Sequence, residues 1–359
     1  MAKALEEHCG EVVMLGPVKS HFAIIGKILN RTSRVLIGRS VDYHHSMMLA
    51  RRYAQHFSHQ LRQKSCDIIF APAASTEIAL LDTAIPIVYA SDATFRLLTD
   101  YYPFYQKLIS RSVRSGNIIE QLALRNASAV IYPTAWPVQS AVRDYGVDKS
   151  HVHVVPYGPN IESVPSIEVV KSKQFAEHCR LLFVAVEWGR KGGDIAFETL
   201  LELEKLGVNS ELVVVGCVPP RQFRHPRLHV VPFLNKNLDR DRQVFHEILL
   251  TSDFLLLPTR AEAYGIVFCE ASAFGLPSIS TDTGGVSGVV TEGKNGYLLP
   301  PEARGVEYAG LIASLFADKK KLSSLVTSSR AMYDTRLNWD VWGRQMYKIL
   351  ARLATRTGT

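Results

Sequence analysis

Short apolar runs alternate along the whole chain with longer segments in which apolar residues recur every three or four positions. The runs predict strands at residues 12–15, 34–37, 68–71, 87–89, 129–132, 152–155, 180–186, 211–215, 228–231, 254–257 and 277–280. The longer segments predict helices at residues 43–63, 108–126, 194–206 and 241–250. Several runs are continuously apolar, so we expect strands that helices cover on both faces. This alternation predicts an α/β fold with parallel sheets.

The chain has 359 residues, 47% of them apolar, which is enough for two domains with separate cores. Proline, glycine and serine gather at residues 156–172 and predict a linker there. We therefore expect an N-terminal Rossmann-like domain at 1–165 and a C-terminal one at 173–335. An amphipathic pattern in the remaining segment, 336–359, predicts a terminal helix that packs back toward the N-terminal domain.

The formal net charge of +7 is spread over both halves of the chain, without a basic tail. This argues against a nucleic-acid-binding arm and suits anionic small molecules or weak peripheral contact with an anionic membrane. Five cysteines without a C-x-x-C pair argue against a zinc knuckle or a disulfide framework. The N-terminus does not have the pattern of a signal peptide, and no apolar run is long enough to span a bilayer. We expect a cytoplasmic protein, with a location at the inner face of the membrane as the alternative.

The most informative stretch, PTRAEAYGIVFCEASAFGLP at 258–277, directly follows a predicted strand. Ligands bind at the carboxyl ends of strands in open α/β sheets. Glu262 and Glu270 are eight residues apart and would be separated by about 12 Å along a continuous helix. That span fits a sugar at one carboxylate and a ribose at the other, with a diphosphate between them. The alternative is that both are solvated acids on a helix surface.

Three loops of the second half could each offer groups to a phosphate. A helix that starts near Gly265 would present backbone amides to an anion. The loop VAVEWGRKGGD at 184–194 places Arg190 and Lys191 beside two glycines, and TDTGGVSG at 281–288 follows another predicted strand. Each alone could be an ordinary loop, but three at the strand ends of one sheet favour a shared anion site. The chain contains neither a P-loop nor a G-x-G-x-x-G fingerprint.

Together these segments resemble the nucleotide-sugar-binding domain of retaining glycosyltransferases of family 4, the group 1 glycosyltransferases with the GT-B fold. The resemblance extends over 181–297 and, more weakly, over ASAVIYPTAWPVQSAV and VVPYGPNI in the first half. It implies two Rossmann-like doubly wound domains that face a cleft. It also implies metal-independent transfer of a sugar from a nucleotide-diphosphate sugar to an acceptor, with retention of anomeric configuration and no further cofactor.

The resemblance also implies roles for individual residues. Lys191, assisted by Arg190, would neutralise the diphosphate, Glu262 would contact the donor sugar and Glu270 would hold the ribose. The diphosphate-binding amides would come from Gly265, Ile266, Val267, Gly284 and Gly285. Residues 234–238 would lie near the nucleobase.

The sequence departs from the family in three places. Many relatives carry Gly-Arg where Ala185 and Val186 stand, and a histidine near the reacting sugar where Asp92 stands. Asp92 is therefore a candidate catalytic residue, with a helix N-cap as the alternative. The opening MAKALEEHCGEVVML is similar to the helix that follows the family's first glycine-rich loop, so we expect the first strand and that loop to be missing.

The histidines at 44, 45, 56 and 59 fall on the predicted helix 43–63. The i, i+3 spacing of His56 and His59 would allow a metal site, but we expect these two side chains to be solvated and no metal to bind. The acceptor is unspecified: a sugar, a lipid-linked molecule or a small molecule, for which the aromatic residues of 101–105 are candidate contacts.

Three hypotheses about the function remain. The chain is an active glycosyltransferase, an impaired paralogue that binds nucleotide without catalysis, or another nucleotide-sugar enzyme such as an epimerase.

Overall fold

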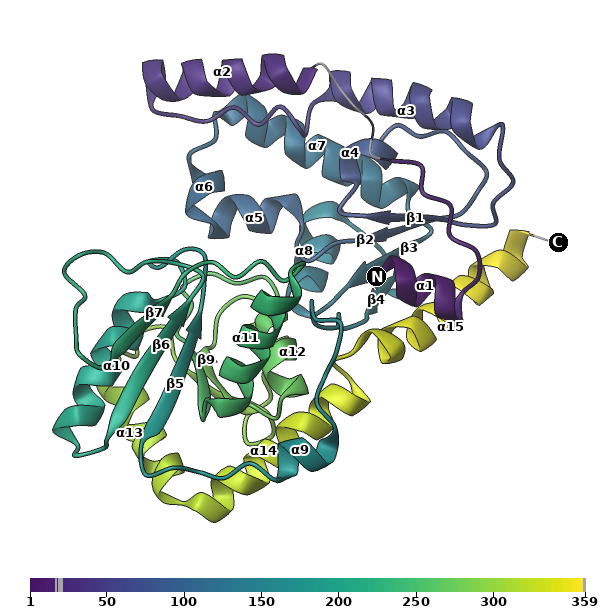
Figure 1. The fold of residues 1–359 in the computed structure, drawn as a ribbon. Coiled ribbons are helices and arrows are strands. Elements are labelled where there is room, and N and C mark those ends of the chain that lie inside the picture. Colours follow the sequence, from purple (N-terminus) through teal and green to yellow (C-terminus); the bar gives the residue numbers. More distant parts are fainter. Residues whose placement is uncertain (17, 19–21, 358–359) are drawn as a thin grey trace. The chain divides into compact units, whose positions relative to one another are not determined.

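The structure, a computed structural model, describes residues 1–16, 18 and 22–357 (Figure 1). The chain divides into two compact units. The first comprises Met1–Val155 together with Gly343–Thr359, and the second comprises Pro156–Trp342. Helix α9 (Ile167–Lys171) forms inside the segment 156–172 that was predicted as a linker.

The second unit contains a sheet of six parallel strands. They are β5 (Cys179–Val184), β6 (Ser210–Val215), β7 (Leu228–Val231), β8 (Phe254–Leu257), β9 (Ser278–Thr281) and β10 (Gly296–Leu299). Their order, β10-β9-β8-β5-β6-β7, is that of a doubly wound Rossmann-like sheet. The chain enters in the middle of the sheet at β5 and continues through β6 to the edge strand β7. It then returns to the middle and forms the other half with β8, β9 and β10. This creates a topological switch point between β5 and β8.

Helices cover both faces of this sheet, with α10 and α13 on one side and α11 and α12 on the other (Figure 1). The helices are α10 (Gly193–Lys205), α11 (Asp239–Thr251), α12 (Ile266–Ala273), α13 (Gly305–Ala317) and α14 (Lys319–Thr335), with the 3-10 turn η2 (Val286–Gly288). All four residues of β8 are buried as a result. The double cover explains why this strand is continuously apolar rather than alternating.

The first unit has a parallel sheet of four strands in the order β1-β2-β3-β4. They are β1 (Ile69–Pro72), β2 (Ile87–Ala90), β3 (Ala129–Tyr132) and β4 (Val152–Val154). The helical elements are α1 (Ala2–His8), α2 (Phe22–Ile37), α3 (Met47–Leu61), α4 (Ser75–Ile78), α5 (Phe95–Tyr101), α6 (Pro103–Gln106), α7 (Ser110–Asn126), α8 (Trp136–Tyr145) and η1 (Lys149–His151). The central strands β2 and β3 are fully buried.

Two predicted strands of the first half are wrong. Residues 12–15 form no regular element, and Val13 and Met14 are exposed. Residues 34–37 are the last turn of α2. A four-residue apolar run does not reveal its periodicity, and here it continues a helix that docks through Gly26, Asn30 and Ser33. The first sheet therefore has four of the six strands that the pattern predicts for the first half of the chain.

Helix α15 (Trp339–Thr357) is the last element, and its residues from Gly343 onward belong to the first unit. Gly343 packs against α1: a Cβ atom at this position would lie 2.2 Å from the His8 ring. The absence of a side chain thus allows the terminal helix to contact α1 closely.

Candidate functional site

Two loops meet at the switch point of the second sheet, residues 185–192 after β5 and residues 258–265 after β8. Strands β5 and β8 are hydrogen-bonded neighbours, so the loops at their carboxyl ends lie side by side. Gly192 has φ +76°, and a Cβ there would lie 1.9 Å from the Pro258 carbonyl oxygen. The Arg260 amide donates to the Arg190 carbonyl at 2.8 Å. Glycine and this hydrogen bond together hold the loops against each other.

Lys191 and Glu262 form an ion pair across these loops. Both side chains are largely buried, at 13% and 11% exposed. The Gly285 amide, from the loop after β9, donates to the Glu262 carbonyl at 3.1 Å. The structure thus brings together one residue from each of the three loops that the sequence singled out. The ion pair itself was not predicted.

Arg190 braces the same loops. Its guanidinium donates to the Glu187 carboxylate at 3.0 Å and to the Ala261 carbonyl at 2.9 Å. These contacts bind the loop after β5 to the loop after β8. The side chain therefore has a structural function, and its predicted role as a helper to Lys191 stays a prediction.

Helix α12 begins at Ile266, so residues 262–265 are not helical. The predicted helix start near Gly265 is confirmed. The condition of a continuous helix from Glu262 to Glu270 is not met, so the rise of about 12 Å does not apply. Gly265, at φ +84°, is the N-cap, and a Cβ there would lie 2.6 Å from the Phe268 ring. The amides of Gly265, Ile266 and Val267 nevertheless occupy the helix N-terminus, where amides lack intrahelical acceptors.

Glu270 is 2% exposed and carries an unpredicted partner. The Lys236 ammonium, from the loop between β7 and α11, donates to Glu270 Oε1 at 2.7 Å. Burial raises the pKa of Glu270, and the Lys236 charge together with the Asn160 amide partly offsets this rise. Lys236 belongs to the segment 234–238 that was predicted to lie near a nucleobase, so the structure places it beside the residue predicted to hold the ribose.

The first unit has a cavity of about 360 Å³ at the carboxyl ends of β1 and β2. Its lining comprises His45, Ala73, Ser75, Tyr89, Ser91, Asp92, Ala93, Phe95, Leu98, Tyr102, Tyr105 and Glu120. Asp92 is exposed, and Thr94, not Asp92, caps α5 by accepting from the Leu97 amide at 3.3 Å. The N-cap alternative for Asp92 is therefore wrong. Ala73 adopts φ +49°, a strained value for a residue with a side chain.

His45 is a cavity residue that sequence reasoning missed. Helix α3 begins at Met47 with Ser46 as its N-cap, so His45 lies before the helix and not on it. Its Nδ1 lies 2.6 Å from Asp42 Oδ2. Burial lowers the pKa of His45, but the hydrogen bond and charge of Asp42 outweigh burial and raise it overall. An acid three residues before a histidine, ahead of a capping serine, was the available signal.

Glu120, on α7, lies in the same cavity and is 2% exposed. The Tyr89 hydroxyl donates to its carboxylate at 3.3 Å. Burial raises the pKa of Glu120 to about 7, although His45 and Tyr89 act in the opposite direction. This carboxyl group consequently titrates near neutral pH.

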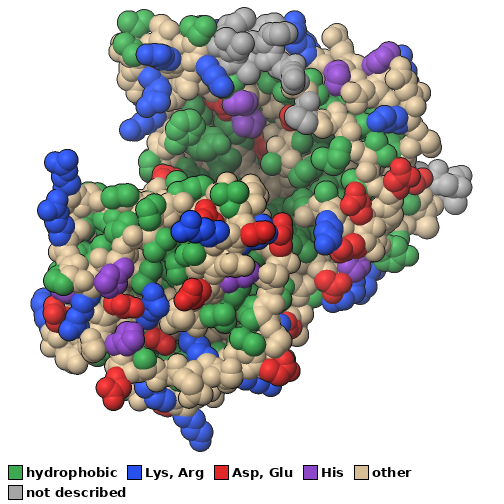
Figure 2. All heavy atoms as spheres, in the orientation of Figure 1, with side chains coloured by type: hydrophobic (Ala, Val, Ile, Leu, Met, Phe, Trp, Pro, Cys, Tyr) green, Lys and Arg blue, Asp and Glu red, His purple; other side chains and the backbone are tan. Residues whose placement is uncertain are grey.

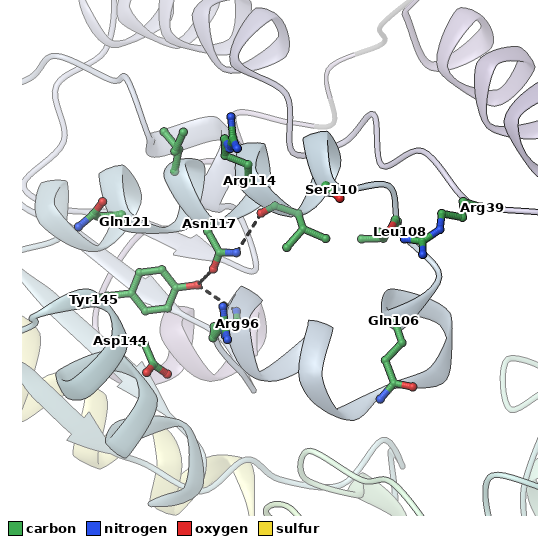
Figure 3. A pocket seen from close by; sticks show the side chains of 12 residues that line it. Arg39, Arg96, Gln106, Leu108, Ser110, Arg114, Asn117, Gln121, Asp144 and Tyr145 are labelled. Atoms are coloured by element: carbon green, nitrogen blue, oxygen red, sulfur yellow. Dashed lines mark hydrogen bonds between the residues drawn. The ribbon is translucent and has the colours of Figure 1, made fainter. Parts of the chain in front are cut away.

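A second cavity of the first unit, about 720 Å³, is lined by Arg39, Arg96 and Arg114 (Figure 3). These side chains come from the segment after α2, from α5 and from α7. Behind them the Tyr145 hydroxyl accepts from the Arg96 amide at 2.9 Å and donates to Asn117 Oδ1 at 2.7 Å. The lining carries three cations and one carboxylate, so the cavity favours an anionic ligand.

The chain matches one family model, within the second unit, and its likeness to individual proteins extends further. Residues 180–332 match the family model "Glycosyl transferases group 1". The D-inositol 3-phosphate glycosyltransferase of Xylanimonas cellulosilytica is 26% identical over 67% of this chain and 61% of its own length. The enzyme of the same name from Jonesia denitrificans is 30% identical over 67% of this chain and 60% of its own length. The chain thus spans about 60% of the length of these relatives.

The Anabaena protein HepE, solved in complex with UDP, superimposes with a TM-score of 0.64. It is 18% identical, with 84% of this chain and 82% of HepE covered. At this identity the likeness shows the fold alone. Similar likenesses to solved glycosyltransferases show the GT-B-like fold that the sequence predicted. Residues 180–332 are thus similar to the group 1 glycosyltransferases, and the likeness to solved structures shows a GT-B-like fold.

Proposed function

We propose that this protein transfers a sugar from a nucleoside-diphosphate sugar to a hydroxyl acceptor, with retention of configuration and without a metal ion. The Lys191–Glu262 ion pair at the switch point carries this proposal. It places a cation and a carboxylate side by side where doubly wound sheets bind ligands. The pairing also keeps both buried charges neutralised when no donor is bound.

In this mechanism Lys191 turns toward the diphosphate and Glu262 accepts hydrogen bonds from the donor sugar. The amides of Gly265, Ile266, Val267 and Gly284 donate hydrogen bonds to the phosphate oxygens. The Gly285 amide, predicted for the same role, donates to the Glu262 carbonyl and holds the loop instead. Glu270, held by Lys236, accepts the ribose hydroxyls. A preorganised cation and aligned amides stabilise the charge that develops on the departing diphosphate.

A uridine nucleotide is the donor that the comparisons favour. HepE, which has the same fold, was solved with UDP and with UDP-glucose. We therefore place UDP-sugars first among the candidate donors.

The acceptor half of the reaction belongs to the first unit. The cavity with Asp92, His45 and Glu120 offers hydrogen-bonding groups beside the rings of Tyr102 and Tyr105, a combination that suits a polyol ring. Its volume of about 360 Å³ fits one such ring. The arginine-lined cavity suits an anionic substituent, and the relatives named for D-inositol 3-phosphate point to a phosphorylated cyclitol.

A thermal-shift screen of UDP, GDP, ADP and their sugars, followed by transfer assays with inositol 3-phosphate and unphosphorylated inositol, tests the proposal. We expect UDP to raise the melting temperature by mass action and the matching UDP-sugar to be consumed only with an acceptor present. A chain that binds none of these nucleotides would contradict the donor site. Binding without turnover of any donor would instead support the impaired paralogue, which the comparisons do not favour.

A further inference from the structure

Helix α2 of the first unit presents three separate faces. Its docking face consists of Gly26, Asn30 and Ser33, which follow one another at intervals of four and three residues. Gly26 is buried, and a Cβ there would lie 2.2 Å from the Tyr43 ring. Asn30 Oδ1 accepts from the Val41 amide at 3.0 Å, and Ser33 Oγ donates to the Arg39 carbonyl at 2.8 Å. This face fixes the helix against residues 39–43, the segment that directly follows it.

The second face is apolar and points away from the protein. Ile28, Leu29, Val35 and Leu36 have the i, i+1, i+7, i+8 spacing of one helical stripe, roughly 130° around the helix from the docking face. They are 60%, 55%, 78% and 76% exposed. A helix that lies on a globular protein normally turns its apolar stripe toward the core. Here the small and polar stripe docks, and the apolar stripe is left in solvent.

The third face is basic and borders the apolar one. Lys27, Arg31 and Arg34 follow one another at intervals of four and three residues, and α2 contains no acidic residue. Figure 2 shows hydrophobic and basic side chains next to one another at the edge of the first unit where Figure 1 places α2. Long basic side chains can extend toward lipid phosphates while a neighbouring apolar stripe enters the acyl region.

Helix α14 is a basic helix that lacks the exposed apolar stripe of α2. Helix α14 also carries three consecutive cations, Lys319 to Lys321, yet among the described residues none of its large apolar side chains is exposed. It therefore resembles an ordinary solvated helix. Pairing of α2 with a second copy of itself would bring like charges together, whereas an anionic surface complements them.

We propose that α2 docks this protein onto an anionic membrane surface, lying in the plane of the interface with Ile28, Leu29, Val35 and Leu36 in the lipid. No helix within the described part of the chain is long and apolar enough to cross a bilayer. The docking is therefore peripheral, and it is independent of the proposed glycosyl transfer. The net charge of +7 suggested membrane contact but not its place, because the pattern at 34–37 was interpreted as a strand.

Vesicle flotation of the full chain tests this proposal, with phosphatidylcholine vesicles compared with vesicles that also contain phosphatidylglycerol. We expect flotation with the anionic vesicles only, and a loss of flotation at high salt. Val35→Ser combined with Leu36→Ser should weaken binding by at least about tenfold, because it removes apolar contact with the lipid. Arg31→Ala combined with Arg34→Ala should weaken binding to anionic vesicles in the same way.

Two exposed apolar residues elsewhere in the chain provide the matched control. Val218→Ser combined with Val306→Ser removes side chains of similar exposure outside α2 and should leave flotation unchanged. Equal flotation of the α2 variants and the wild type, or no flotation with any vesicle, would overturn the proposal. Analytical sedimentation without vesicles tests the alternative that α2 pairs with a second copy of the chain. A dimer that dissociates in the Val35→Ser, Leu36→Ser variant would make α2 a protein interface and would also overturn the membrane proposal.

Discussion

Lys191 and Glu262 pair as ions although 71 residues separate them in the sequence. Each follows one of the two strands that flank the switch point of the second sheet, β5 and β8. The pair satisfies two largely buried charges within the protein. A donor that inserts a diphosphate and a sugar between them would replace one set of favourable contacts by another, so binding need not leave either charge unpaired.

The first prediction concerns Lys191. We expect Lys191→Ala to lower kcat for the preferred donor by roughly 100- to 1,000-fold, because the variant removes a preorganised cation beside the departing diphosphate. Steady-state kinetics with a saturating acceptor would measure the effect. Lys205→Ala, on the exposed last turn of α10, is the control and should keep wild-type turnover. Undiminished kcat in Lys191→Ala would remove this residue from the mechanism.

The second prediction concerns the close approach of the two loops at Gly192. Gly192→Ala combines a left-handed φ of +76° with a Cβ 1.9 Å from the Pro258 carbonyl oxygen. We expect it to cost more than the ~1–2 kcal/mol of backbone strain alone and to weaken nucleotide binding. Gly207→Ala is the matched control, since φ is +74° there but no atom lies within 4 Å of the added Cβ. Urea unfolding and UDP titration would compare them. Equal losses in both variants would show that the contact with Pro258 is unimportant.

The third prediction concerns the Lys236–Glu270 pair. Lys236→Met leaves the Glu270 carboxylate buried without its cation and should cost about 1–2 kcal/mol, reduced from the fully buried case because Lys236 is 30% exposed. The double variant Lys236→Met with Glu270→Gln should recover most of that stability. It should still bind UDP weakly, because the ribose contact is altered. Recovery of binding together with stability would argue against a role for Glu270 in binding nucleotide.

The fourth prediction is a pH dependence of stability that arises from Glu120. Its folded pKa of about 7 lies above the ordinary value of 4.5, so the folded state binds the proton more tightly than the unfolded state does. The contribution to stability is complete below about pH 4.5 and is lost as the pH rises through 7, with a total of about 3 kcal/mol. Glu120→Gln should flatten the decline in unfolding free energy between pH 5 and pH 8. Exposed Glu302→Gln should leave the slope unchanged, and a wild-type slope in Glu120→Gln would contradict the prediction.

The fifth prediction concerns the cavity of the first unit that contains His45, Asp92 and Glu120. His45→Gln and Asp92→Asn should raise KM for the acceptor by about tenfold, through the loss of one charged hydrogen bond each, while KM for the donor stays constant. Competition assays with acceptor analogues would measure this difference. A change in donor KM alone would place these residues outside the acceptor subsite.

Most strands and loops of the second unit could be predicted from the sequence, because each is marked by neighbouring residues in the chain. The predicted strands 228–231 and 254–257 match β7 and β8 in their observed bounds. Strand ends followed by glycine and charged residues identified the loops with Lys191, Glu262 and Gly285. Strand β10 was missed, since its four residues, GYLL, follow a turn-rich segment without a clear apolar run. Segment 34–37 was misassigned because a β-branched apolar run at a helix end has the same composition as a strand.

The sequence by itself determined the α/β class, five of the six strands of the second sheet and the residue types that approach a phosphate. Only the tertiary structure decided which of those residues meet. Ion pairs such as Lys191 with Glu262 and Lys236 with Glu270 depend on the order of strands in the sheet, and apolar periodicity is the same for every strand order. The same limit applies to His45 and Glu120, whose shared cavity and pKa shifts arise from burial by segments distant in the chain. It applies also to α2, where docking through three small and polar residues left the apolar stripe in solvent.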